Sequence, residues 1–166
     1  MTPIKAIIVD DEIAARDVLL NLIIRSKSPI EVVAQCIDLE EAVVAIKKLK
    51  PSVVFLDVQM PNYAGYEIAS FFTSIDFEII FVTAYDQYAI KAFELNAIDY
   101  LVKPINRQRL QEALDKLTEK IVQKDDINRF HVLLESMKDK EHGKIVISDL
   151  GFKRVISLAD IIAIEA

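Results

Sequence analysis

Five short apolar runs, each leading into a polar turn and a helical pattern, constrain the fold more than any other feature of this sequence. The runs read IKAIIVD, EVVAQCI, SVVFLDV, FEIIFVTA and DYLV. Strands that are apolar on both faces are typical of a parallel sheet covered by helices on each side. Connections between such strands are right-handed. Residues 1–122 are therefore predicted to form an α/β domain with a doubly wound, five-stranded parallel sheet.

Helical patterns occupy the intervals between these runs. Residues 12–27 carry apolar side chains at helical spacing, and Asp38 is a candidate N-cap for the segment LEEAVVAIKKL. A short helix is expected over residues 66–72 and another over residues 85–95. A fifth helix begins near Asn106, after Pro104 ends the last strand.

The fifth helix is expected to end within the segment QKDD, where the apolar stripe changes phase. We expect a break at residues 124–126 and a helical linker over residues 123–143. The apolar face of that linker either packs on its own domain or contacts a second copy of the chain. Both readings stay open from the sequence.

Residues 144–166 change to the alternating pattern of strands. Ile145 and Ile147 alternate with polar neighbours, DLGF provides a turn, and RVISL and IIAIEA are strand-like. A segment this short cannot build a core of its own, because chains below about 40 residues rarely fold unaided. We expect it to be the first part of an all-β domain in a longer protein.

Composition and charge narrow the classes of function. The chain is 52% hydrophobic, with three Gly and five Pro, which is typical of a globular protein. Its net charge of −6 arises within residues 1–103, so this part is a poor candidate for holding a phosphate backbone. Cys36, the only cysteine, is expected to be a buried apolar residue. The sequence has no membrane-spanning stretch or signal peptide, and a cytoplasmic location is expected.

Polar side chains stand where four of the predicted strands end. They are Asp10 and Asp11 after the first strand, Asp57 after the third, Thr83 at the end of the fourth and Lys103 after the fifth. In an open α/β sheet, ligands bind beyond the carboxyl ends of the strands. Three neighbouring carboxylates repel one another unless a cation lies between them, and oxygen ligands of this kind suit Mg²⁺. The pattern predicts a magnesium site.

Each of these residues also has an ordinary explanation. Asp11 could cap the helix that begins beside it, and Asp57, Thr83 and Lys103 could each be a common residue at the end of a strand. Their joint placement at the carboxyl ends favours a site, because packing alone does not predict it.

Four segments carry a resemblance to a known family. VDDE, FLDVQMP, FVTAY and DYLVKP resemble the signature segments of the receiver domains of response regulators in two-component signalling, which have a flavodoxin-like fold. The resemblance implies that Asp57 accepts a phosphoryl group from a sensor histidine kinase. It further implies that Asp11, Asp57 and the backbone carbonyl of Gln59 bind Mg²⁺, with Asp10 acting through water.

The same resemblance assigns roles around the phosphoryl group. Thr83 and Lys103 would contact it, Tyr100 would be the aromatic switch, and the Lys103–Pro104 peptide would be cis. The side chains two positions beyond Asp57 and Thr83 would border the path of the hydrolytic water. They are Gln59, which orients a water or only occupies space, and Tyr85, which shields the site or packs on the following helix.

Three functions compete. The tail resembles the start of a DNA-binding domain of the LytTR type, found in LytR/AlgR regulators, which implies that the full-length protein controls transcription. The alternative is a receiver that acts only through protein contacts, and the face formed by residues 85–95, the fifth strand and the fifth helix is a candidate homodimer contact. An aspartyl phosphatase of the haloacid dehalogenase type requires a second Asp two positions beyond the nucleophile. This chain has Gln59 there, so we do not expect an enzyme.

Overall fold

The computed structural model describes residues 3–85, 87–138, 144–149 and 152–157. The chain divides into two compact units, residues 1–121 and residues 122–166, and each is considered by itself.

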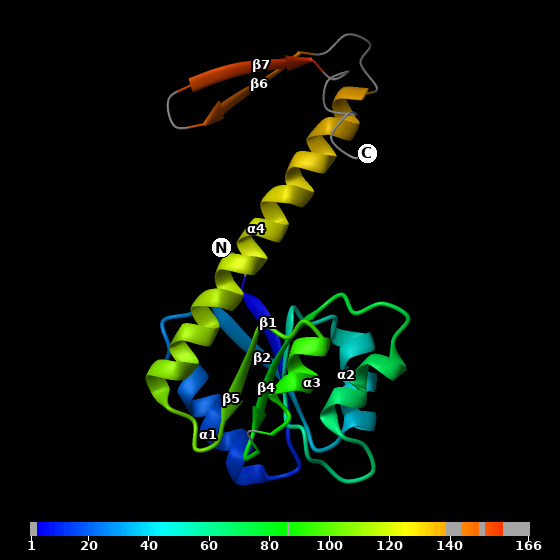
Figure 1. Ribbon diagram of the computed structural model, residues 1–166, viewed down its shortest axis with the longest axis vertical. Helices are drawn as coiled ribbons and strands as arrows, with labels where there is room; N and C mark the ends of the chain where they lie inside the picture. Colours follow the sequence, from blue (N-terminus) through cyan, green and yellow to red (C-terminus); the bar gives the residue numbers. More distant parts are fainter. Residues whose placement is uncertain (1–2, 86, 139–143, 150–151, 158–166) are drawn as a thin grey trace. The chain divides into compact units, whose positions relative to one another are not determined.

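The first unit is built on a sheet of five strands: β1 (Ile4–Val9), β2 (Ile30–Cys36), β3 (Val53–Leu56), β4 (Glu78–Thr83) and β5 (Asp99–Val102). Every strand pairs in parallel with its neighbours, in the order β2-β1-β3-β4-β5 (Figure 1). The predicted doubly wound parallel sheet is confirmed. Between β1 and β3 the strand order reverses, which is where sheets of this kind bind ligands.

Five helical segments connect and follow the strands: α1 (Ile13–Ile24), α2 (Leu39–Leu49), the 3-10 helix η1 (Gly65–Phe71), α3 (Ala89–Glu94) and α4 (Arg107–Lys138). Asp38 is the N-cap of α2, as predicted, and its carboxylate accepts the backbone N–H of Glu41 at 2.8 Å. The third helical segment has the expected length, but η1 is a 3-10 helix, and α3, with six residues, is shorter than the predicted helix over residues 85–95.

Helices cover both faces of the sheet, which explains why its strands are apolar throughout (Figure 1). On one face, Leu19 of α1, Phe55 of β3 and Leu114 of α4 belong to one core cluster. On the other face, Leu39 of α2 and Ile68 of η1 belong to a second core cluster. Both surfaces of the central strands β1, β3 and β4 are therefore largely removed from water, whereas the edge strands β2 and β5 are partly exposed.

An ion cluster ties the start of β5 to α4. The buried carboxylate of Asp99 forms a two-fold hydrogen-bonded pair with the guanidinium of Arg109 and lies 2.9 Å from the Lys116 ammonium. Burial alone would raise the pKa of Asp99. The hydrogen bonds from Arg109, Lys116 and the Tyr100 backbone outweigh burial, so the pKa of Asp99 is lowered below its ordinary value.

The expected break at residues 124–126 is wrong, because α4 runs without interruption from Arg107 to Lys138. Residues 107–138 contain no Gly or Pro, so nothing in the backbone forces the helix to stop. The change of phase in the apolar stripe alters which side of the helix is apolar, but it leaves the hydrogen-bonding pattern of the helix intact. The linker predicted at residues 123–143 thus begins inside a helix.

The second unit contains an antiparallel hairpin of β6 (Lys144–Asp149) and β7 (Phe152–Ser157). The strands predicted around Ile145 and in RVISL are therefore present. The last predicted strand, IIAIEA, lies outside the described residues.

Two further expectations concern the described part of the chain. Cys36 is 1% exposed at the end of β2, and burial, followed by the negative charges of Glu41 and Asp38, raises the pKa of its thiol to about 12. It is thus an inert core residue, as predicted. Of the helices described, none has the length and apolar character needed to cross a bilayer.

Adjacent valines on α2 provide a test of the two-sided core. Val43 is 8% exposed and Val44 is 68% exposed. We expect Val43→Ala to lower the free energy of unfolding by roughly 2 kcal/mol, because it removes buried methyl groups and leaves a cavity.

The matched change Val44→Ala should shift the free energy of unfolding by less than about 0.5 kcal/mol, because that side chain faces water. Urea denaturation followed by circular dichroism measures both variants. Equal losses of unfolding free energy in the two variants would show that α2 does not pack on the sheet as described.

Candidate functional site

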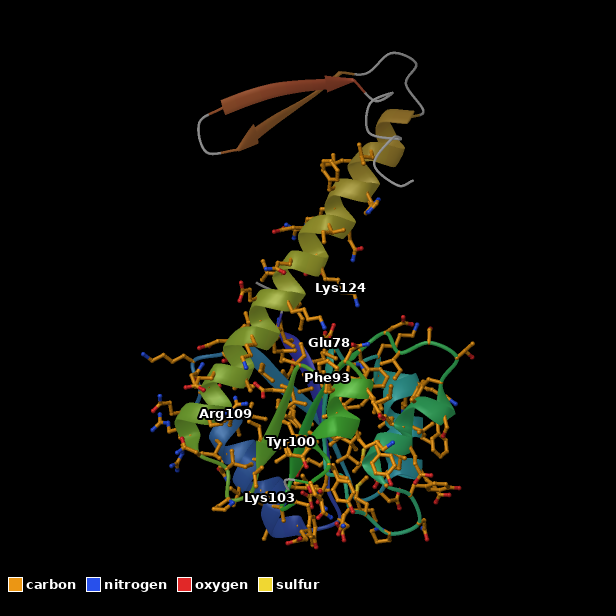
Figure 2. All side chains as sticks on the ribbon, in the orientation of Figure 1. Glu78, Phe93, Tyr100, Lys103, Arg109 and Lys124 are labelled. Carbon is orange, nitrogen blue, oxygen red and sulfur yellow. The ribbon has the colours of Figure 1, made fainter. Side chains whose placement is uncertain are left out.

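The carboxyl edge of the sheet brings together the polar residues singled out in the sequence. Asp10 follows β1, Asp57 follows β3, Thr83 ends β4 and Lys103 follows β5. Because all these strands are parallel, their carboxyl ends lie at one edge. Figure 2 shows Lys103 at this edge, beyond the end of β5.

Backbone hydrogen bonds fix the strand ends that carry these side chains. The Asp57 N–H donates to the Val9 carbonyl at 2.9 Å, and the Lys103 N–H donates to the Thr83 carbonyl at 2.8 Å. The peptide bond between Lys103 and Pro104 is cis. These bonds hold Asp57 and Lys103 immediately beyond the ends of their strands.

Three carboxylates form the acidic part of the site. One oxygen from each of Asp10, Asp11 and Asp57 lies within 4.8 Å of the others. Asp10 is 4% exposed and Asp57 is 5% exposed, whereas Asp11 faces solvent. Such a set of hard oxygen donors, two buried and one open, suits a divalent cation.

Lys103 supplies the positive charge that faces the buried acids. Its ammonium lies 2.6 Å from Oδ2 of Asp10 and 3.1 Å from Oδ2 of Asp57. Burial raises the pKa of Asp10, and the bonds from Lys103 and the Glu12 N–H only partly oppose this. Burial acts to lower the pKa of Lys103, but Asp10 and Asp57 outweigh it and the pKa is raised. The ammonium therefore stays charged, yet one cation does not balance three carboxylates.

The start of α1 shows that Asp11 has no capping role. The N-cap residue is Glu12, and no side-chain capping bond is made there. The carboxylate of the preceding acid, Asp10, accepts the Glu12 N–H at 2.9 Å, and the Asp10 carbonyl accepts a bond from Arg16 at 2.6 Å. The carboxylate of Asp11 lies beside the other two acids instead. The alternative that Asp11 caps the helix after β1 is therefore wrong.

Thr83 brings a hydroxyl that lacks a partner. The residue is fully buried, and its Oγ1 atom has no hydrogen-bond partner among the described residues. An unsatisfied buried hydroxyl costs about 1–3 kcal/mol, so the position demands an explanation. A ligand oxygen at this edge of the sheet would satisfy it.

The residues two positions beyond Asp57 and Thr83 lie in contact with the start of α3. The side-chain amide of Gln59 donates to the hydroxyl of Tyr88 at 3.1 Å, and its backbone N–H donates to Asp57 at 3.3 Å. The ring of Tyr85 is 43% exposed and packs edge-on against Tyr88, with centroids 6.3 Å apart.

Tyr100 lies on β5 and is half-buried (Figure 2). Its hydroxyl donates to the backbone carbonyl of Tyr85, and its ring lies 6.3 Å from that of Phe81. The side chain is thus bonded to the loop that follows Thr83.

Sequence reasoning missed the part played by Gly65. A Cβ atom at this position would lie 2.0 Å from the carbonyl oxygen of Asp57 and 3.1 Å from the Leu56 side chain. The Gly65 N–H donates to the Val58 carbonyl at 2.8 Å. The absence of a side chain therefore lets η1 approach the backbone of the central acid. The chain has only three glycines, and this scarcity was the one feature of the sequence that could have indicated a special role for Gly65.

Comparison with known proteins finds a matching family profile and similar curated proteins. The family profile described as the response regulator receiver domain matches residues 6–115. The transcriptional regulatory protein BtsR of Escherichia coli is 44% identical over 126 residues, which are 74% of this chain and 51% of BtsR. The sensory transduction protein LytT of Bacillus anthracis is 41% identical over 115 residues, 68% of this chain and 46% of LytT.

A solved structure gives the same result for the fold. The response regulatory domain of protein mrkE from Klebsiella pneumoniae is 33% identical, with a TM-score of 0.65 over 72% of this chain and 98% of that one. The chain spans about half the length of the curated relatives it matches.

The close approach at Gly65 generates a prediction. Gly65→Ala should lower the free energy of unfolding by about 1–3 kcal/mol, because the new methyl group collides with the Asp57 carbonyl and the backbone has to shift. The neighbouring change Ala64→Gly adds no atom and should cost only the extra chain entropy, about 0.4–1 kcal/mol. Urea denaturation measures both. A Gly65→Ala variant as stable as the parent chain would contradict the contact.

Proposed function

Because this chain belongs to the response regulator receiver family, we propose that it accepts a phosphoryl group on Asp57 from a sensor histidine kinase. The observation that carries the proposal is the placement of Asp57, which is 5% exposed, 3.1 Å from the Lys103 ammonium and beside two further carboxylates. A buried carboxylate with both a cation and metal-ligating acids around it suits phosphoryl transfer, which depends on positioning and charge neutralisation.

The acidic cluster fits Mg²⁺. The proposed ligands are the carboxylates of Asp11 and Asp57 and the backbone carbonyl of Gln59, with Asp10 acting through water. The fit rests on the chemistry of the donors, since three hard oxygen ligands within 4.8 Å of one another face a single lysine. When bound, the ion would offset negative charge on the phosphoryl oxygens.

The chain's own residues complete the transfer. An oxygen of Asp57 forms the new bond to phosphorus as the bond to the donor's histidine nitrogen breaks. Lys103 is already held at hydrogen-bond distance from Asp57 and offsets the added charge. The unpaired hydroxyl of Thr83 donates to a phosphoryl oxygen, which would supply the partner that the buried group lacks.

The signal is proposed to leave through the segment that follows β4. A phosphoryl group adds about −1.5 to −2 charge with strong acceptor oxygens, so Thr83 is drawn toward it. Tyr100 is bonded to the carbonyl of Tyr85, two residues along the chain from Thr83, and is proposed to move inward as the switch. The face formed by α3, β5 and α4 then carries the message to a partner.

Control of transcription is proposed for the whole protein. The relatives include a transcriptional regulatory protein, and the hairpin of residues 144–157 suits the start of a LytTR-type DNA-binding domain. The acidic excess in residues 1–103 argues that the receiver itself does not hold DNA. Output through protein contacts alone, including a homodimer through the α3-β5-α4 face, is the alternative, and the DNA affinity of the full-length protein distinguishes the two.

A regulator is proposed in preference to an enzyme. An aspartyl phosphatase of the haloacid dehalogenase type needs a second acid two positions beyond the nucleophile, and Gln59 occupies that position. Its side chain is an amide bonded to Tyr88 and cannot act as a general acid at neutral pH.

The acceptor assignment is tested by incubation with acetyl phosphate and Mg²⁺. The 166-residue chain should gain a single phosphoryl adduct in intact-mass spectrometry, and Asp57→Ala should gain none, because the variant lacks the proposed acceptor carboxylate. Asp38→Ala is a matched control, since it removes an Asp that only caps α2 and should leave the adduct unchanged. An equal adduct on Asp57→Ala would refute the assignment.

The shielding role of Tyr85 is tested by the lifetime of the phosphate. Hydrolysis needs a water in line with the bond to Asp57, and a large ring beside the site is proposed to restrict its approach. Tyr85→Ala should speed dephosphorylation several-fold and leave Mg²⁺ affinity nearly unchanged. The measurement is phosphate release from the labelled chain, and an unaltered decay rate would show that Tyr85 is no shield.

A further inference from the structure

We propose that Tyr88 is a positioning residue that holds the amide of Gln59 at the mouth of the site and so prolongs the life of the phosphate on Asp57. The inference rests on the proposed function and deepens it. It assigns a role to a residue that the sequence did not single out and that lies five positions beyond Thr83.

The bond between the two residues joins distant parts of the chain. The Gln59 side-chain N–H donates to the Tyr88 hydroxyl at 3.1 Å, across 29 residues of sequence. Gln59 lies on the loop between β3 and η1, and Tyr88 immediately precedes α3. Both side chains, together with Asp11, line one open cavity of about 440 Å³. The bonded pair therefore shares a cavity with Asp11, the exposed acid of the cluster, and is proposed to stand on the path of solvent to Asp57.

Aromatic contacts hold Tyr88 in place. Its ring lies 6.1 Å from that of Tyr66 at a tilt of 35°, and 6.3 Å from that of Tyr85 in an edge-on arrangement of 77°. Pairs of this geometry are favourable. The hydrogen bond from Gln59, followed by one from Gln87, lowers the pKa of the Tyr88 hydroxyl, as expected for a phenol oxygen that accepts hydrogen bonds. The acceptor that meets the Gln59 amide is thus fixed by two neighbouring rings.

The chemistry of hydrolysis gives the direction of the effect. A water oxygen forms a bond to phosphorus as the bond to the Asp57 oxygen breaks, and the water's proton passes to solvent. A free Gln59 amide could orient that water with its carbonyl and N–H groups, as a catalytic amide does in other phosphoryl transfers. Bonded to Tyr88, the amide is held across the cavity instead. Loss of the bond frees the amide and widens the path for water, and both changes speed hydrolysis.

The test uses Tyr88→Phe in the full 166-residue chain, which removes the hydroxyl and keeps the ring. We expect the first-order loss of phosphate from Asp57 to accelerate roughly three- to ten-fold, the kinetic effect of losing one hydrogen bond. The rate of phosphorylation by acetyl phosphate and the Mg²⁺ affinity should stay at their parent values. Tyr63→Phe is the matched control, because its ring packs on Phe71 outside the cavity, and its decay rate should not change.

A double-mutant cycle shows whether Tyr88 acts through Gln59. In a Gln59→Ala background, Tyr88→Phe should have no further effect on the decay rate, because the bond is already absent. An unchanged decay in the single variant, or an equal acceleration in both backgrounds, would overturn the proposal. A parent chain that takes up no phosphoryl group would overturn the proposed function as well, so the two failures are distinguishable.

Discussion

The ammonium of Lys103, held between the buried carboxylates of Asp10 and Asp57, is the interaction on which the site depends. Two carboxylates this deeply buried lose the stabilisation of water and repel each other, so a nearby cation is needed to offset their charge. The lysine is 2.6 Å from one and 3.1 Å from the other, and it remains charged because of them. A third acid, Asp11, is left to attract a further cation. The edge of the sheet is therefore short of positive charge, which suits the proposed binding of a metal and a phosphoryl group.

The parallel sheet makes this arrangement possible, and the opposite end of β5 secures it. Lys103 reaches the acids because β5 runs parallel to β4 in register, with Thr83 paired to Val102. At the other end of the same strand, Asp99 is fixed to α4 by Arg109 and Lys116. Ion pairs therefore anchor the four-residue strand β5 at both ends. The backbone that carries Lys103 is fixed in this way, in addition to the contacts of the Lys103 side chain itself.

The sequence allowed the strands, the Asp38 cap and the meeting of Asp10, Asp57 and Lys103 to be predicted, because apolar runs and strand ends follow from local pattern. The uninterrupted helix α4 was not predicted. A change of phase in the apolar stripe suggests a break in the helix, but by itself it does not change the backbone. Gly65 and Tyr88 were missed for another reason. The role of each depends on a contact with a residue distant in sequence or across a turn, and no spacing rule reveals such a contact.

The segment from Thr83 to Tyr88 connects these observations. It carries the unpaired hydroxyl of Thr83, the carbonyl of Tyr85 that accepts from Tyr100, and the Tyr88 hydroxyl that accepts from Gln59. All three groups lie within six consecutive residues, so in the proposed function a displacement of Thr83 toward a ligand acts on the other two bonds through the same backbone. The hydroxyl proposed to contact the phosphate and the acceptors of the Tyr100 and Gln59 hydrogen bonds thus share one piece of backbone. In the proposed function, activation and signal decay would both act through this segment, and no separate pathway through the core is required.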